Sequence, residues 1–174
     1  HGQKYEPVSQ MYYEYVYNTK IKEYGCIPHE THKFLGASPD GINADPNSNR
    51  YGRMLEIKNI VNREINGIPK KEYWIQMQLQ MECCNLFETD FLECRFKEYP
   101  DYNEFIKDGK TFNKTESGKY KGVMLQFHIN GKPHYEYMPW GITEQECDAW
   151  EENMKTKLEI VLLIPQLNIL GEIK

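Results

Sequence analysis

Three residues of this sequence have the types and the spacing needed to bind a divalent cation and activate water. Asp40 lies between Pro39 and Gly41, a combination typical of a tight turn. Glu56 and Lys58 follow in the alternating segment of residues 54–61. Successive side chains of a strand point to opposite faces, so Glu56 and Lys58 should share one face, with Cα atoms about 7 Å apart. We therefore expect two carboxylates and a lysine to converge on one small site.

The chemistry of such a site follows from its donor atoms. Two carboxylates and a backbone carbonyl are the oxygen ligands that Mg²⁺ prefers, and the ion usually keeps several waters. A bound cation lowers the pKa of its water from about 15.7 towards neutrality and offsets the charge that develops on a phosphate. Lys58 would orient that water or stabilise the reacting phosphorus. An isolated Glu-x-Lys pattern is otherwise typical of a surface ion pair. Together with the turn at Asp40 and a buried glutamine downstream, it predicts a metal-dependent nuclease.

The elements that must position these residues follow from the spacing of the apolar side chains. A first helix is expected from about Tyr5 to Tyr24, ending at Gly25, and a second over residues 72–86. Residues 45–52 are rich in turn formers and should form a loop. Strands are expected at residues 26–27, at residues 34–35, after the turn through Ile42, at residues 54–61 and at residues 91–96. The order is therefore helix, three strands, helix, strand.

The second predicted helix carries the downstream glutamine. Its expected apolar stripe consists of Trp74, Met77, Met81 and Cys84. Gln78 falls within that stripe, and an unpaired amide on a buried face costs about 1–3 kcal/mol. Gln78 is therefore expected to have a partner at the site, whereas Gln76 should point elsewhere.

The remainder of the chain predicts a hairpin and a helix. Residues 123–129 and 134–138 are joined through Asn130-Gly131, which favours a two-residue hairpin turn. Thr143 and Glu146 form a capping box for a last helix, and its apolar residues are Trp150, Met154 and Leu158. We expect a single domain over residues 1–174, with a core of about residues 1–97 and an addition of about residues 98–174.

The composition limits the class of protein. An apolar content of 40% in 174 residues indicates one globular domain, and no apolar run is long enough to cross a bilayer. The cysteines number 5 and include no C-x-x-C pair, which argues against a disulfide scaffold and a zinc ribbon. An intracellular protein that is not secreted is therefore expected. Because the chain opens on His1, we also expect it to be a segment of a longer protein.

The net charge of −5 does not by itself indicate a nucleic-acid-binding protein. Basic contacts to DNA could nevertheless be local. The candidates are Arg50 and Arg53, Lys70 and Lys71, and the run Lys107, Lys110, Lys114, Lys119 and Lys121. Each single lysine of that run is more simply explained as a solvated loop residue.

A zinc site is a further alternative. His29-Glu30-Thr31-His32 resembles the zinc protease helix H-E-x-x-H but is one residue too short, and Pro28 precedes it. No third ligand is evident, so we expect a solvated loop.

Four segments together match the motifs of one nuclease superfamily, in order and spacing. They are residues 1–7 for R-G-x-x-x-E-P, residues 35–41 for L-G-A-S-P-D-G, residues 55–58 for L-E-I-K and residues 73–78 for Y-x-x-Q-x-Q. Over about residues 1–97 the chain resembles the PD-(D/E)XK nuclease superfamily and, within it, the lambda-exonuclease/YqaJ-type viral recombinases of large DNA viruses. It departs from them at His1, which replaces the arginine, and at Asn59-Ile60, where Cys-Pro is common. The family's preceding W-x-x-x-R and G-[SA]-S elements are not in this segment.

The resemblance implies a fold and a set of roles. The fold would be α/β (α+β), a restriction-endonuclease-like αβββαβ core with a central mixed sheet flanked by helices, plus the C-terminal hairpin and helix. Asp40, Glu56 and the carbonyl of Ile57 would ligate Mg²⁺, for which Mn²⁺ can substitute. Glu6 would approach a second metal or its waters, although alone it is equally a favourable helix-start acid. Gln78 would hold Lys58 or a substrate phosphate.

The implied activity is a 5′→3′ exonuclease on linear double-stranded DNA with free ends, acting in recombination, repair or viral genome processing. A structure-specific endonuclease of the same fold and a catalytically inactive DNA-binding module are the alternatives. A single-strand annealing protein would be the partner, and a ring-shaped homotrimer is implied as the assembly. The site of action would be the host cytoplasm or a viral replication site, without a membrane.

Overall fold

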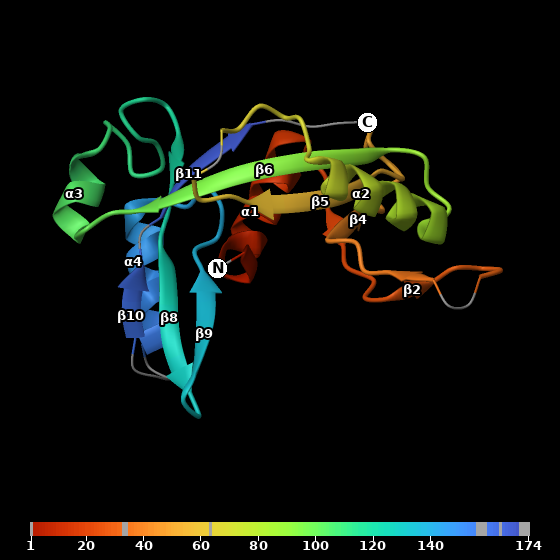
Figure 1. The fold of residues 1–174 in the computed structure, drawn as a ribbon. Helices are drawn as coiled ribbons and strands as arrows, with labels where there is room; N and C mark the ends of the chain where they lie inside the picture. The colour runs from red at the N-terminus through yellow and green to blue at the C-terminus, as the bar shows by residue number, and fades with distance from the viewer. Residues whose placement is uncertain (1, 33–34, 63, 156–159, 164, 171–174) are drawn as a thin grey trace. The chain divides into compact units, whose positions relative to one another are not determined.

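The computed structural model describes residues 2–32, 35–62, 64–155, 160–163 and 165–170. The chain divides into two compact units, one within residues 1–94 and 169–174 and the other within residues 95–168. Figure 1 labels most of the helices and strands of both units. The strand β6 (Thr89–Glu98) begins in the first unit and ends in the second.

The first unit is built on a mixed sheet. Its strands, in spatial order, are β1 (Ile21–Lys22), β4 (Gly41–Asn43), β5 (Met54–Asn59) and β6. β1 pairs with β4 and β4 with β5 in antiparallel register, whereas β5 and β6 run parallel. A parallel pair needs a crossover connection, and α2 (Lys71–Cys84) lies within it.

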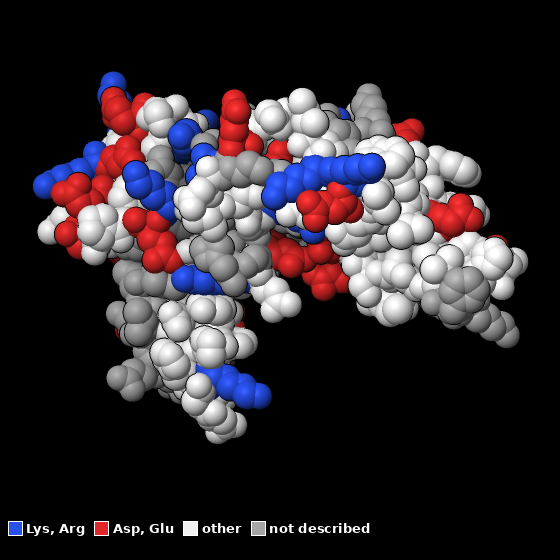
Figure 2. Space-filling view, viewed as in Figure 1, with Lys and Arg blue, Asp and Glu red and all other residues white. Residues whose placement is uncertain are grey.

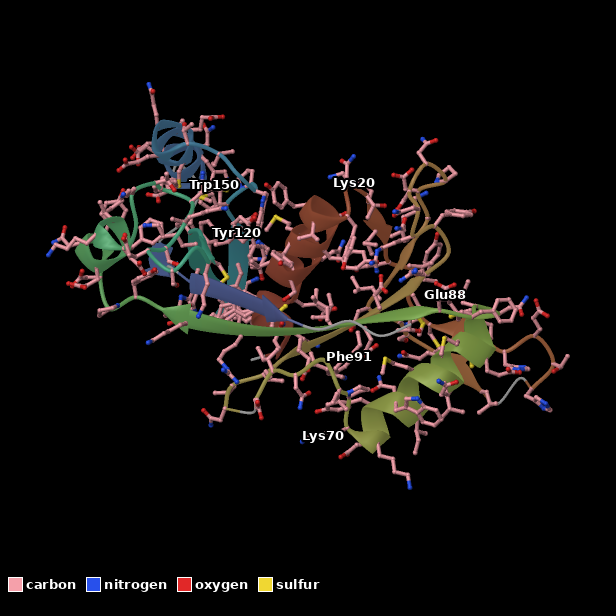
Figure 3. All side chains as sticks on the ribbon, turned by 90° about the horizontal axis from the view of Figure 1, so that it is seen from above. Lys20, Lys70, Glu88, Phe91, Tyr120 and Trp150 are labelled. Atoms are coloured by element: carbon pink, nitrogen blue, oxygen red, sulfur yellow. The ribbon has the colours of Figure 1, made fainter. Side chains whose placement is uncertain are left out.

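The two helices of this unit cover opposite faces of the sheet (Figure 3). The hydroxyl of Tyr13, on α1 (Gly2–Val16), donates to Asp90 on β6. The ring of Tyr73, on α2, lies 6.3 Å from that of Phe91. Asp90 and Phe91 are consecutive on one strand and therefore point to opposite faces. The α/β class, the αβββαβ order and the helix-flanked mixed sheet are thus confirmed.

The first helix is shorter than predicted. α1 ends at Val16, not near Tyr24, and the prediction over residues 17–24 is wrong. Asn18 adopts a left-handed conformation with φ 48°, which ends a helix. Ile21 then pairs with Asn43 in the sheet, and its amide donates to Glu14 Oε2 at 2.9 Å. Pairing with β4 outweighs the apolar spacing that suggested a continued helix.

The predicted short hairpin is confirmed, with its strands displaced by one or two residues. β2 (Ile27–Pro28) pairs with β3 (Gly36–Ala37) in antiparallel register, as a ribbon separate from the main sheet. Cys26 precedes the ribbon, and Phe34 lies outside the described residues. The loop at residues 45–52, the strand from Met54 and the second helix follow as predicted, with ends shifted by a few residues.

A buried ion-pair network secures the loop between β4 and β5. Asp90 is fully buried, and its two oxygens accept from Arg50 Nη1 at 2.8 Å and Arg53 Nη1 at 2.9 Å. The guanidinium of Arg50 also lies 3.7 Å from the centre of the Tyr17 ring. These two arginines, considered above as DNA contacts, are therefore engaged within the first unit.

The second unit contains the predicted hairpin and helix. β8 (Met124–Ile129) pairs with β9 (Lys132–Tyr137) through Asn130 and Gly131, whose φ angles of 51° and 77° fit a two-residue hairpin turn. Glu146 donates its amide to Thr143 Oγ1 at 3.1 Å at the start of α4 (Glu144–Lys155), which confirms the capping box. Leu158 lies outside the described residues. The core of this unit consists of Phe105, Val123, Leu125, Phe127, Met138 and Cys147.

Four further elements, which lie wholly or mostly in this unit, were not predicted from the sequence. They are α3 (Tyr102–Lys107), β7 (Tyr120–Lys121), β10 (Ile160–Leu163), which pairs with β8, and β11 (Pro165–Leu170), which pairs with β7. Lys121 is buried, and its ammonium donates to the carbonyls of Phe105 at 2.6 Å and Asp108 at 2.5 Å. Burial lowers its pKa. Lys121 is therefore an internal structural residue.

The face seen in Figure 2 shows no single dominant sign of charge. Figure 2 shows acidic and basic side chains mixed over the visible face. In the part of the chain that the structure describes, no helix is long and apolar enough to cross a membrane.

The ion-pair network predicts a large loss of stability for Asp90→Ala. Removing one partner of a buried pair leaves uncompensated charge, which typically costs about 3–5 kcal/mol. Urea unfolding should show a loss of that size in the free energy of unfolding. The exposed Asp148→Ala is the control, with a change within about 0.5 kcal/mol. A loss below about 1 kcal/mol for Asp90→Ala would contradict the structural role of the network.

Candidate functional site

Asp40 is fixed at the point where β4 begins. Its Oδ2 accepts the backbone N–H of Ile57 on β5 at 2.7 Å. With isoleucine at position 21, the following residue must be glycine, because a Cβ at Gly41 would lie 2.1 Å from Ile21 Cγ2 on β1. The P-D-G turn therefore brings the chain close to β1 and places a carboxylate over β5.

Glu56 and Lys58 share a face of β5, as predicted. Glu56 Oε1 lies 3.0 Å from Lys58 Nζ, and Glu56 is 2% exposed. Lys58 is half-buried, and its ammonium lies 4.6 Å from the centre of the Tyr73 ring on α2. This face of β5 is thus covered by α2, which leaves the acid and the lysine in a poorly hydrated setting.

The glutamine that reaches Lys58 is Gln76, contrary to expectation. Its Oε1 is 3.5 Å from Lys58 Nζ, whereas Gln78 is exposed. The burial predicted for Gln78 and the outward direction predicted for Gln76 are both wrong. A role of Gln78 towards a substrate phosphate stays a prediction.

The predictions for Gln76 and Gln78 failed because the side of α2 that faces the sheet differs from the side expected from the sequence. The buried residues of the helix are Met77, Gln80 and Cys83, and Trp74 is half exposed. Ile75 and Leu79 are exposed too, so apolar residues lie on more than one side of the helix. The periodicity therefore fits several phases, and packing against β5 and β6 selects one that the sequence pattern did not indicate.

Glu6 on α1 joins this group of acids. It hydrogen-bonds to Asp40 through its side chain, and its pKa rises to about 7, mainly through burial and then through the charge of Asp40. Burial also raises the pKa of Asp40, against the N–H of Ile57 and the charge of Lys58, which lower it. The pKa of Glu56 rises to about 7, mainly through burial and then through the charge of Asp40. The structure thus brings Glu6, Asp40, Glu56 and Lys58 together.

Two features of these side chains bear on cation binding, namely their placement and the chemistry of their donor atoms. As placed, no three His, Cys, Asp or Glu side chains in the described part of the chain are positioned to hold one ion together. The donor set nevertheless suits a hard cation, because it consists of carboxylates that are close, partly buried and reluctant to ionise together. Glu56 Oε2 is buried and has no hydrogen-bond partner, so it could accept a cation without losing another contact. The residues present therefore fit a divalent cation.

Two residues at the site were missed by sequence analysis. Tyr73 belongs to the Y-x-x-Q-x-Q match but was given no role. Gln80 is 6% exposed, and it affects the pKa of Glu56 by hydrogen bonding. Its only sequence signal is its position four residues after Gln76.

The histidine pair of the β2–β3 ribbon has a structural contact. His29 Nε2 lies 3.1 Å from Glu82 Oε1 on α2, and its Nδ1 accepts the amide N–H of His32 at 2.9 Å. Nε2 of His29 thus links the ribbon to α2, whereas Nδ1 is engaged within the segment that follows β2.

The raised pKa values predict how the stability of the metal-free protein depends on pH. For Glu6 and Glu56 the pKa rises from 4.5 to about 7. The folded protein thus binds these protons more tightly than the unfolded chain, and their stabilising effect is complete below pH 4.5 and lost as the pH rises through 7. Urea unfolding in a chelator should show this decline, which Glu6→Gln should reduce. The exposed Glu30→Gln should leave it unchanged, and an equal decline in Glu6→Gln would contradict the assignment.

An Acanthamoeba polyphaga mimivirus protein, described as uncharacterized protein R354, is 40% identical over 120 residues, which cover 62% of this chain and 22% of the relative. The chain thus spans about a fifth of the length of that relative. A crystal structure of LHK-Exo in complex with dAMP is 32% identical and covers 53% of this chain and 47% of that chain, with a TM-score of 0.44.

A family model matches the part of the chain that carries the site. The model describes the YqaJ-like viral recombinase domain and matches residues 1–91, which is more than half of the 174 residues. The match includes Glu6, Asp40, Glu56 and Lys58, as well as the whole of α2. The chain belongs to the family of the YqaJ-like viral recombinase domain.

Proposed function

We propose that this domain is a metal-dependent deoxyribonuclease that hydrolyses phosphodiester bonds. The observation that carries the proposal is the arrangement of Asp40 and Glu56 beside Lys58, with one carboxylate fixed to the strand that bears the other two groups. Membership of a recombinase family supports DNA as the substrate.

Each residue of the site has a role in this proposal. Asp40, Glu56 and the carbonyl of Ile57 would hold Mg²⁺ or Mn²⁺, and Glu6 would hold a second ion or its waters. The bound cation would supply a water of low pKa and offset negative charge on the phosphate. Lys58 would orient the attacking water and stabilise the charge on the phosphoryl oxygens. Gln76 and Tyr73 would keep the ammonium of Lys58 in place.

The direction of digestion, the form of the DNA and the biological process are proposed from the resemblance to the viral recombinases. The domain would be a 5′→3′ exonuclease that resects linear double-stranded DNA inside the cell, during recombination, repair or viral genome processing. The exposed strand would pass to a single-strand annealing protein, and the active form would be a homotrimer.

A second candidate is a catalytically inactive DNA-binding module of the same fold. One observation favours it: among the described residues, no three acidic, histidine or cysteine side chains are placed to hold an ion together. Calorimetry with Mg²⁺ and Mn²⁺ distinguishes the two, because the module would bind neither ion, whereas the nuclease requires one of them.

Lys58→Met should nearly abolish cleavage of DNA while the protein stays folded. Groups that orient water or transfer a proton typically contribute about 10²–10⁴-fold to the rate, and methionine keeps the length of the side chain but not the charge. The measurement is the initial rate on duplex DNA with Mg²⁺. Lys20→Met, at an exposed position labelled in Figure 3, is the matched control and should retain the parent rate. Cleavage by Lys58→Met at the parent rate would refute the assigned role.

The form of the DNA should decide whether it is degraded. An end-labelled linear duplex should be shortened from its 5′ ends in the presence of Mg²⁺ and remain intact with a chelator. Covalently closed circular DNA should remain intact in both conditions, because it offers no end. Cleavage of the circle would favour the structure-specific endonuclease instead, and loss of label from the 3′ ends would contradict the polarity.

A further inference from the structure

The ring of Tyr73 on α2 contacts two lysines. Lys58 Nζ lies 4.6 Å from the centre of the ring, and Lys70 Nζ lies 5.9 Å from it. An ammonium within about 6 Å of the centre of an aromatic ring is attracted to that ring. Lys58 is half-buried, whereas Lys70 is exposed. One ring therefore holds the ammonium of the candidate site and, close to it, a second ammonium that is open to solvent.

The backbone at Lys70 is fixed where α2 begins. Its carbonyl accepts the N–H of Trp74 at 3.0 Å, which is the first hydrogen bond of the helix. Three residues before Lys70, the N–H of Gly67 donates to Glu93 Oε1 at 3.2 Å, and Glu93 is fully buried on β6. Glu93 is also the register partner of Lys58 in the parallel pairing of β5 and β6. The segment that leads to Lys70 is thus tied to the strand beside Lys58.

Lys70 is available for a ligand, unlike the arginines considered as DNA contacts. Arg50 and Arg53 both pair with the buried Asp90. Among the residues that the structure describes, no carboxylate pairs with Lys70, and its one contact beyond the helix is with the Tyr73 ring. The lysines of the run over residues 107–121 belong to the second unit. Within the first unit, the charge of Lys70 is therefore open to an anion of the substrate.

We propose that Lys70 binds a phosphate of the substrate strand next to the phosphate that is cleaved beside Lys58. The inference rests on the proposed function, because it takes DNA as the substrate and Lys58 as the group at the scissile phosphate. Phosphates follow one another along a strand at about 3.4 Å of helix rise, so two ammoniums on one ring can reach neighbouring phosphates. Contacts to phosphates position a strand without reading its sequence. Lys70 thus sets the affinity and the register of the DNA and takes no part in the chemical step.

Lys70→Met tests this role, because it keeps the length of the side chain and removes the charge. The measurement is the Kd for a fluorescently labelled linear duplex, by anisotropy in a chelator over a series of salt concentrations. Each phosphate contact contributes about 0.9 to the slope of log affinity against log salt. We expect the slope to become shallower by about that amount, and the Kd to rise about 10-fold at 0.1 M salt. With Mg²⁺, the KM should rise while kcat stays that of the parent, the reverse of Lys58→Met.

Two other lysines separate a phosphate contact from general attraction by charge. Lys71→Met removes the same charge at the next position, and it should lower the affinity less and keep the parent slope. Figure 3 shows Lys20 and Lys70 on opposite sides of β6, and Lys20→Met should preserve the Kd, the slope and the rate.

The outcomes that contradict the inference differ from those that contradict the proposed function. An unchanged slope for Lys70→Met, or an equal fall in slope for Lys71→Met, would overturn the phosphate contact at Lys70. A fall in kcat at unchanged KM would also overturn it, because Lys70 would then act on Lys58 and not on the DNA. Failure of the parent to cleave DNA would overturn the proposed nuclease, whereas binding in the chelator would still decide whether Lys70 contacts a phosphate.

Discussion

The candidate site depends on one hydrogen bond, from the backbone N–H of Ile57 to the carboxylate of Asp40. The antiparallel ladder of β4 and β5 ends where Gly41 faces Leu55, because the chain turns at Pro39 and leaves the sheet. Ile57 lies two residues beyond this last pair, where β4 no longer runs beside β5. Its backbone N–H donates to the side chain of Asp40 instead of to a strand. The same contact that completes the sheet therefore holds the first acid against the strand that carries the second acid and the lysine.

The second constraint is the parallel pairing of β5 and β6. Parallel strands require a crossover, and here α2 lies over the face to which Glu56 and Lys58 point. Charged groups beneath a helix need polar partners, and α2 supplies them as amides among apolar residues. On the opposite face, α1 brings Glu6 to Asp40 and binds β6 through Tyr13 and Asp90. Each helix therefore covers one face of the sheet and also contributes a side chain to the candidate site.

Much of this arrangement could be predicted from the sequence, because it depends on local rules. Alternation along a strand put Glu56 and Lys58 on one face, the P-D-G turn placed an acid before β4, and Asn130-Gly131 indicated the late hairpin. The end of α1 and the phase of α2 depend instead on contacts between distant segments. β1 and β7 are two-residue strands without a periodicity of their own, and each is defined by a partner strand far along the chain. Gln80 escaped notice for the same reason, since its burial is decided by packing.

The glycine of the P-D-G turn, Gly41, has a consequence for the evolution of the family. A methyl group at position 41 would overlap the γ-methyl of Ile21, so the side chains at positions 41 and 21 compete for the same space. Family members with alanine or serine at position 41 would have to carry a smaller residue at position 21, or hold their first strand further from the turn. An alignment of many members should therefore show these two columns changing together, even though only one of them lies within a recognised motif.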